Sequence, residues 1–202
     1  MPDSNCLNVK HLTVCYDRKP ALWEAQVSIP QGTMTGIVGP NGAGKSTFLK
    51  AILDLIPATS GSVKFFGEDY RKVRHRIAYV PQRESVDWDY PISAREVVVM
   101  GRYRSIGLFR RVSREDRRKA DEALDRVGML DRADSQIGSL SGGQQQRVFL
   151  ARALVQEADL YLMDEPFAGI DATTERVILE LMRDLRESGA SLVCVHHDLP
   201  TV

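Results

Sequence analysis

The sequence predicts an α/β fold in which a mainly parallel sheet carries an antiparallel β edge and an inserted helical subdomain. Several short apolar runs are rich in β-branched residues and lack strict polar alternation, as is typical of parallel strands. Amphipathic helical repeats lie between some of these runs, which favours alternating strands and helices. The opening stretch alternates more regularly, which predicts the antiparallel edge. We expect one domain over residues 1–202.

The strands of the parallel sheet are predicted from the apolar runs. These runs cover residues 35–38, 77–80, 160–163 and 191–195. Because their apolar residues do not alternate strictly with polar ones, we expect both faces of each strand to be buried. The alternating segments that predict the antiparallel sheet are residues 7–16, 25–29 and 62–67.

Helical spacing of apolar residues predicts two long helices. They cover residues 120–127 and 177–185, and Gly128 and Gly189 follow them as expected ends. Residues 85–140 are rich in helix-forming and charged residues and separate two halves of the core. We therefore expect a nucleotide-binding core of residues 1–84 and 141–202, with residues 85–140 as the inserted helical subdomain.

Composition and charge set the broad class. The chain has 27 Lys plus Arg and 27 Asp plus Glu, so no excess of basic charge indicates a nucleic-acid partner. The three cysteines are scattered and, like the four histidines, show no metal-ligand spacing, which favours free thiols in a cytosolic protein. Residues 1–12 do not form a secretion signal, and no run approaches the roughly 20 apolar residues of a spanning helix. Any membrane role would therefore depend on a partner.

A phosphate-binding loop follows the strand at residues 35–38. It fits the pattern G-x-x-x-x-G-K-[ST] and opens a predicted helix at residues 46–55, a strand–loop–helix context that a chance glycine turn does not explain. Glycines let backbone N–H groups surround the phosphates, while Lys45 would reach the β and γ phosphates and Ser46 would bind Mg²⁺. The predicted nucleotide-binding residues are Gly39, Pro40, Asn41, Gly42, Ala43, Gly44, Lys45, Ser46 and Thr47.

Two carboxylates end the apolar strand at residues 160–163. We expect Asp164 to hold the Mg²⁺ through water, and Glu165 to face the attacking water as general base. An acidic strand end that serves only solubility is the alternative for this pair taken alone. The phosphate-binding loop upstream favours the catalytic interpretation.

A second glycine-bearing loop narrows the class. It reads Leu140-Ser141-Gly142-Gly143-Gln144, and with it the chain resembles the nucleotide-binding subunit of an ATP-binding cassette (ABC) transporter. The resemblance implies that Ser141, Gly142, Gly143 and Gln144 cap the γ-phosphate bound on a second copy, so that two head-to-tail chains enclose two ATP molecules. A plain helix cap is the alternative, and it explains Ser141 but not the other residues.

The resemblance implies further site residues. Gln82 matches a loop glutamine that contacts Mg²⁺ and the attacking water, and Asp171 lies in a loop that couples the two sites. His197 matches a histidine that contacts the γ-phosphate, with His196 as the competing candidate. Tyr16 matches an aromatic residue on which adenine stacks, although it would also fit as a packed residue of the β edge.

Residues 87–103 are similar to importers of manganese, zinc or iron. The implied partners are a permease at the cytoplasmic face of the membrane, with this chain bound peripherally, and indirectly an extracytoplasmic metal-binding protein. Trp88 and Tyr90 suit permease docking, or else belong to the core of the subdomain. An importer of another substrate and a soluble ABC ATPase remain as alternatives. The transported metal would not be bound by this chain, for which ATP and Mg²⁺ are the expected cofactors.

The end of the chain departs from the family. Members typically continue beyond the histidine that matches His197, whereas this sequence ends at Val202. We therefore expect an apparently truncated C-terminus. The expected consequence is an uncovered edge at the strand of residues 191–195.

Overall fold

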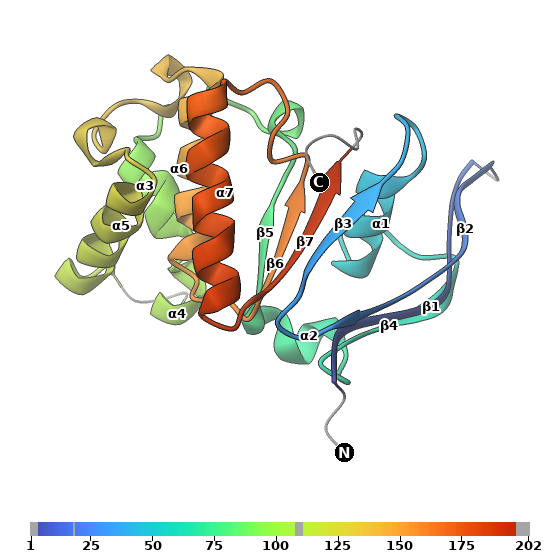
Figure 1. The fold of residues 1–202 in the computed structure, drawn as a ribbon. Coiled ribbons are helices and arrows are strands. Elements are labelled where there is room, and N and C mark those ends of the chain that lie inside the picture. Colours follow the sequence, from blue (N-terminus) through green and yellow to red (C-terminus); the bar gives the residue numbers. More distant parts are fainter. Residues whose placement is uncertain (1–3, 18, 108–110, 197–202) are drawn as a thin grey trace.

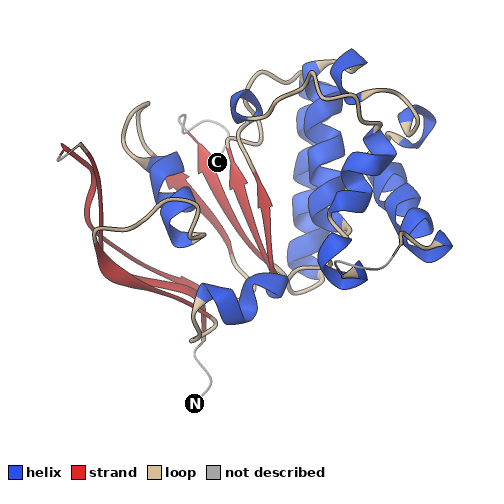
Figure 2. Cartoon of the chain, turned by 180° about the vertical axis from the view of Figure 1, so that it is seen from behind, coloured by secondary structure: helices blue, strands red, loops and turns tan. Residues whose placement is uncertain are grey.

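The computed structural model describes residues 4–17, 19–107 and 111–196 of the 202-residue chain. A three-stranded antiparallel sheet and a four-stranded parallel sheet are packed together with helix α1 (Lys45–Ile52) between them. The larger helices lie beyond the other side of the parallel sheet, as Figures 1 and 2 show from opposite directions. The predicted α/β class with an antiparallel β edge is confirmed.

The antiparallel sheet has the strand order β2-β1-β4. Its strands are β1 (Asn5–Tyr16), β2 (Lys19–Pro30) and β4 (Ser60–Phe65). Register shifts interrupt the pairing of β1 with β2, so the burial of side chains along β1 does not alternate strictly. The apolar side chains of β1 and β4 pack with Phe48, Leu49 and Ile52 of α1. The sheet therefore covers one side of the helix that follows the phosphate-binding loop.

The parallel sheet has the order β3-β7-β6-β5. Its strands are β3 (Met34–Val38), β5 (Ile77–Val80), β6 (Leu160–Asp164) and β7 (Ser191–His196). All residues of β6 and β7 are buried, as expected for central strands.

Two expectations about this sheet are wrong. Residues 35–38 are exposed or half-buried in alternation; β3 is one of the two edge strands of this sheet in the described part of the chain, and β5 is the other. Residues 191–195 have no uncovered edge, because β7 pairs with β3 on one side and with β6 on the other. The edge that the sequence analysis assigned to the last strand thus belongs to β3 and β5.

Helices α3 to α7 lie on the side of the parallel sheet away from α1 (Figure 1). The remaining α-helices are α2 (Tyr70–Val73), α3 (Ala94–Met100), α4 (Tyr103–Ile106), α5 (Arg114–Arg126), α6 (Gly142–Leu154) and α7 (Ala172–Glu187). Short 3-10 turns cover Arg74–Arg76, Arg83–Ser85, Leu130–Arg132 and Ile137–Ser139. The predicted helices at 120–127 and 177–185 fall largely within α5 and α7, and Gly128 and Gly189 follow with left-handed φ angles of 64° and 94°.

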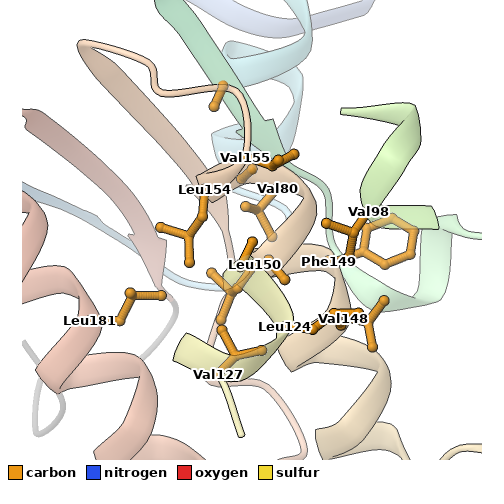
Figure 3. Packing of buried hydrophobic residues seen from close by; sticks show 14 of the residues in the cluster. Val80, Val98, Leu124, Val127, Val148, Phe149, Leu150, Leu154, Val155 and Leu181 are labelled. Carbon is orange, nitrogen blue, oxygen red and sulfur yellow. The ribbon is translucent and has the colours of Figure 1, made fainter. Parts of the chain in front are cut away.

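The larger apolar cluster joins these helices to β5. Figure 3 shows Val98 of α3, Leu124 of α5 and Val148, Leu150 and Leu154 of α6 around Val80. Burying each such side chain contributes about 1.5–3 kcal/mol relative to exposure. Because α6 packs against both α3 and α5, the helices before and after residue 140 share one core. The division at residues 85 and 140 stays a prediction. No helix in the described ranges is long and apolar enough to cross a membrane.

Candidate functional site

The carboxyl ends of three parallel strands open on one pocket of about 290 Å³. Ligands of open α/β sheets commonly bind at this edge, because several chain segments leave the sheet there. The loop after β3, Gln82 after β5 and Glu165 after β6 meet in this place. The lining residues are Ala21, Asn41, Gly42, Gly44, Lys45, Ser46, Thr47, Gln82 and Glu165. The structure therefore brings together predicted residues from three separate motifs.

The turn that starts α1 depends on glycine at position 44. Gly44 is the N-cap of α1 with a φ of 88° and no side-chain cap hydrogen bond. A Cβ atom at this position would lie 2.4 Å from the carbonyl oxygen of Ala21 in β2. The backbone approach therefore excludes any side chain here. Since no side chain caps α1, its first N–H groups remain directed to a ligand at the positive end of the helix.

Lys45 lies folded against the phosphate-binding loop. Its Nζ donates hydrogen bonds to the carbonyl oxygens of Gly39, at 2.7 Å, and Pro40, at 3.0 Å. The side chain is largely buried and lines the pocket. Because an ammonium group has three donors, one donor remains for an anion in the pocket.

Ser46 lines the pocket, and Asp164 lies directly behind it as its hydrogen-bond partner. Ser46 Oγ donates to Asp164 Oδ1 at 3.0 Å. Asp164 is 1% exposed; among the described residues its Oδ2 has no hydrogen-bond partner of normal geometry, although the carboxyl also interacts with the Tyr79 side chain. Burial raises the pKa of the Asp164 carboxyl, against the Ser46 hydrogen bond, which lowers it. A buried carboxylate oxygen without a hydrogen bond of normal geometry, beside a hydroxyl, is an oxygen set that suits a divalent cation such as Mg²⁺.

Glu165 is directed differently from its neighbour. Its φ is 50°, in the left-handed region that non-glycine residues seldom adopt. Its N–H donates to the carbonyl oxygen of Val195 at 3.0 Å, and its own carbonyl accepts from the Ala168 N–H at 3.1 Å. This turn leaves Asp164 buried while Glu165 lines the pocket. Such backbone strain, about 1–3 kcal/mol, is a common property of functional sites.

The three remaining predicted residues of the nucleotide site differ in their placement. Gln82 lines the pocket at the end of β5, and its carbonyl oxygen accepts from the Ser85 N–H at 3.0 Å. Tyr16 lies half-exposed at the end of β1 and is not among the pocket-lining residues. His197 lies outside the described residues. His196 ends β7 as a buried residue whose ring forms an edge-to-face pair with Phe167, at a centroid distance of 6.0 Å. The choice between the two histidines stays a prediction.

The second glycine-bearing loop lies apart from this pocket and begins α6. Ser141 is the N-cap: the Gln144 N–H donates to Ser141 Oγ at 3.4 Å, and the Ser141 N–H donates to Gln144 Oε1 at 2.9 Å. This reciprocal pair is a capping box, so the helix-cap alternative describes Ser141 and Gln144 within one chain. A Cβ atom on Gly143 would lie 2.9 Å from Thr174 Oγ1, which explains why this position is glycine.

Asp171 links this loop to the segment that follows Glu165. Its Oδ1 accepts from the N–H groups of Thr173 and Thr174, both at 2.9 Å, and caps α7. The lowered pKa of the Asp171 carboxyl follows from these hydrogen bonds, the one from the Thr174 N–H first. Gly143 of α6 packs against this capped turn.

Sequence reasoning missed two residues at this site. Ala21 of β2 lines the pocket and is the backbone that Gly44 approaches. Arg83, directly after Gln82, donates from Nε to Gln145 Oε1 of α6 at 3.0 Å. Neither belongs to a motif, and the adjacency of Arg83 to Gln82 was the one signal in the sequence. Trp88 packs edge-on against Phe149 at 4.9 Å, which supports the core interpretation for it, whereas Tyr90 is 64% exposed.

Comparison with known proteins places this site in a family. The sequence profile described as ABC transporter matches residues 22–168. The manganese transport system ATP-binding protein MntB of Bacillus subtilis is 55% identical over 195 residues, which are 96% of this chain and 78% of the relative. The zinc transport system ATP-binding protein TroB of Treponema pallidum is 55% identical over 196 residues, 97% of this chain and 74% of the relative.

Solved structures agree with this match. The structure of an ATP-binding subunit of an ABC transporter superposes with a TM-score of 0.81 at 28% identity, over 97% of this chain and 81% of that one. A nucleotide-free ATP-binding cassette from an ABC transporter superposes at 0.84, with 24% identity over 98% of this chain and 83% of that one, and shows the fold alone. The chain belongs to the ABC transporter family. It is an ATPase subunit whose ATP hydrolysis is coupled to transport.

Proposed function

We propose that this chain is the ATPase subunit of an importer of divalent metal ions, with manganese or zinc as cargo and iron as a further candidate. The observation that carries the proposal is the 55% identity to a manganese and to a zinc transport ATP-binding protein over nearly the whole chain. The described residues hold no group of three or more His, Cys, Asp or Glu side chains that would bind a metal ion. We further propose that the cargo is bound by other subunits.

The residues of the pocket have separable roles in ATP hydrolysis. Residues 39–44 and the start of α1 would hold the phosphates, and Lys45 would add a charge at the β and γ phosphates. Ser46, Asp164 and Gln82 would hold Mg²⁺, which neutralises charge on the phosphate oxygens when it is bound. Glu165, which faces the pocket, would accept a proton from the attacking water.

The second loop would act on the nucleotide of another copy. Ser141 to Gln144 do not line the pocket of their own chain, yet they begin a helix of 13 residues whose positive end suits a phosphate. We propose a head-to-tail homodimer in which these residues cap the γ-phosphate bound on the partner. Ser141 Oγ is an acceptor in the capping box, so its hydroxyl proton remains to be donated.

The partners in the membrane are permease subunits, with an extracytoplasmic metal-binding protein as an indirect partner. The names of the relatives, which are ATP-binding proteins of transport systems, support this arrangement. The chain would lie peripherally at the cytoplasmic face. Closure of two copies around ATP would move the docked permease helices, and hydrolysis would reopen the pair.

Uptake of radiolabelled manganese tests the proposal. Cells that lack the chromosomal copy would receive the native chain, Glu165→Gln, or the control Glu187→Gln at the end of α7. We expect uptake with the native chain and the control, and its loss with Glu165→Gln, while competition by zinc and iron ranks the cargo. Equal uptake in all three strains would remove the metal assignment and leave an ABC ATPase with another cargo or none.

A further inference from the structure

Another polar pocket lies at the edge of the parallel sheet opposite to the nucleotide pocket. Two of its residues directly precede β5 and a third lies between α6 and β6, whereas the nucleotide pocket lies at the carboxyl ends of the strands. Figure 1 shows α2 and α4 at this end of the sheet. The pocket has a volume of about 220 Å³ and is lined by Arg74, His75, Gly101, Arg104, Ser105 and Gln156. No carboxylate of the described residues lines it.

One wall of this pocket is fixed by the close approach of two helix ends. A Cβ atom on Gly101, directly after α3, would collide with the carbonyl oxygen of Arg152 and would lie 2.7 Å from Val155 Cγ1. Ile106 at the end of α4 is buried, and its N–H donates to the carbonyl oxygen of Arg102 at 2.9 Å. The turn that carries Arg104 and Ser105 is therefore held against the end of α6.

The basic residues near this pocket differ in whether a carboxylate neutralises them. The ion pairs of the neutralised residues are Arg71 with Asp54 at 3.3 Å, Arg76 with Asp159 at 2.5 Å, and Arg102 with Asp116 at 3.2 Å. Within the described ranges, Arg74 and Arg104 form neither an ion pair nor a side-chain hydrogen bond. Glu157, which follows Gln156, pairs with Lys119 at 2.8 Å instead. The two arginines that line the pocket are thus the ones left without a counter-charge.

These two arginines also act on each other. Partial burial lowers the pKa of the Arg104 guanidinium, and the positive charge of Arg74 lowers it further. Two like charges that line one pocket destabilise each other unless an anion lies between them. The arrangement therefore favours a bound anion over an empty pocket.

The donors of the pocket suit a phosphate group better than a carboxylate. Arg74 and Arg104 come from separate elements, and each guanidinium presents a planar set of N–H donors that matches phosphate oxygens. The Ser105 hydroxyl adds an uncharged donor. Donors from several directions are best satisfied by a tetrahedral group with three or more acceptor oxygens, whereas a carboxylate offers two in one plane.

We propose that the pocket formed by Arg74, Arg104 and Ser105 binds a phosphate group. The group is either free phosphate or the phosphate of an anionic lipid headgroup, since the same contacts recognise both. Arg74 and Arg104 would each donate charge-assisted hydrogen bonds to its oxygens, and its negative charge would offset their repulsion. The inference does not depend on the proposed metal importer or on the proposed dimer, because the pocket lies away from the nucleotide site.

Titration with inorganic phosphate tests the proposal. The ¹⁵N-labelled chain would carry Lys45→Ala to weaken phosphate binding in the nucleotide pocket, and sodium chloride would hold the ionic strength constant. We expect the side-chain Nε–Hε signals of Arg74 and Arg104 to shift and to saturate. Each signal is assigned by its loss in Arg74→Gln or Arg104→Gln.

Variants of the two arginines locate the site. Arg74→Gln and Arg104→Gln should each weaken phosphate binding about tenfold, the contribution of one hydrogen bond to a charged group. The matched control is Arg71→Gln, which removes the same charge from α2 where Asp54 already neutralises it, and it should leave binding nearly unchanged. In phosphate-free buffer both pocket variants should have an unchanged or raised Tm, because one of two like charges is gone.

Vesicle binding distinguishes the two sources of phosphate. Vesicles of phosphatidylcholine would be compared with vesicles that contain about one third phosphatidylglycerol, an anionic lipid. Retention on the anionic vesicles that is lost in Arg74→Gln and Arg104→Gln would assign a lipid headgroup. Retention that neither variant changes, together with saturable phosphate binding, would assign free phosphate.

Three outcomes would overturn the inference: no saturable shift of the Arg74 and Arg104 signals, equal shifts with acetate or chloride in place of phosphate, or an equal loss of binding in Arg71→Gln. The proposed function is tested separately. Arg74→Gln and Arg104→Gln in the otherwise native chain should keep the native ATPase rate, so failure at this pocket leaves the ATPase assignment untouched.

Discussion

The two glycine-bearing loops both lead into helices, but they treat the helix N-terminus in opposite ways. Gly44 begins α1 in a left-handed conformation without a side-chain cap. Ser141 begins α6 in an extended conformation with a complete capping box. Both loops use glycine because backbone or side-chain atoms approach closely, at Ala21 for Gly44 and at Thr174 for Gly143. The two loops are similar in composition. The N-terminus of α1 has no side-chain cap, and we call it the open terminus; the N-terminus of α6 is capped by Ser141 and Gln144 of its own chain, and we call it the closed terminus.

This difference indicates two kinds of phosphate contact. An uncapped terminus offers backbone N–H groups to a ligand and gains stability when the ligand binds. A capped terminus is stable by itself and presents a fixed surface with one hydroxyl proton to spare. The first suits a nucleotide held by its own chain, and the second suits contact with a nucleotide that arrives on another copy.

Removal of the Lys45 charge at the start of α1 should give the largest effect on the ATPase rate. Lys45→Ala should lower the ATPase rate by on the order of 100-fold, because the ammonium is aligned for charge on the phosphates. Lys64→Ala, which loses an exposed pair with Asp69, is the control and should keep the native rate. Initial ATPase rates with saturating ATP measure the effect, and a circular dichroism spectrum checks that each variant is folded. A native rate for the folded Lys45 variant would contradict the pocket assignment.

Glycine substitutions within the phosphate-binding loop should have the next largest effect, on Tm and on ATP affinity. Gly44→Ala and Gly42→Ala both place alanine at a positive φ, of 88° and 81°, which costs about 1–2 kcal/mol. Only at Gly44 does the new Cβ collide with backbone, 2.4 Å from Ala21, whereas nothing lies within 4 Å of it at Gly42. We expect a clearly larger fall in Tm and in ATP affinity for Gly44→Ala. Equal falls would show that conformation, and not close approach, requires this glycine.

The closed terminus is best tested with two variants of one residue. Ser141→Ala removes the cap and should cost about 1 kcal/mol, a Tm fall of roughly 2–4 °C for a chain of this size. Ser141→Asp keeps a good cap but brings a negative charge to the proposed phosphate contact. We expect Ser141→Asp to have a near-native Tm, a low ATPase rate and no ATP-induced dimer. Activities that follow the two Tm values would leave Ser141 with a capping role alone.

The smallest effect concerns Asp171, the cap of α7 beside Gly143. Its folded-state pKa is lowered, so its ionised form contributes stability that is present above the ordinary value of 3.8 and is lost as pH falls through the lowered pKa. Asp171→Asn keeps a capping side chain without the charge, so its Tm should fall less than that of Ser141→Ala. The difference from the native chain should shrink as pH falls below 3.8. A difference that stays constant with pH would indicate that packing, not charge, decides.

The sequence by itself determined the fold class, the order of the strands along the chain and the phosphate-binding loop. These features depend on local patterns: apolar runs, helical repeats and residues at fixed spacing. It also predicted Asp164 and Glu165 as a pair with separate roles, and the structure gives the pair two environments, one buried and one facing the pocket. Local chemistry was sufficient for these inferences because each motif lies within a few residues.

Only the tertiary structure decided which strand is the edge, what Gly44 approaches and where Arg83 reaches. Residues 35–38 and 191–195 have similar apolar composition, yet one is an exposed edge and the other is central, because strand order is set by non-local pairing. The contact from Arg83 to Gln145 likewise joins segments far apart in the chain. Such contacts depend on how elements pack in space, which no spacing along the sequence records.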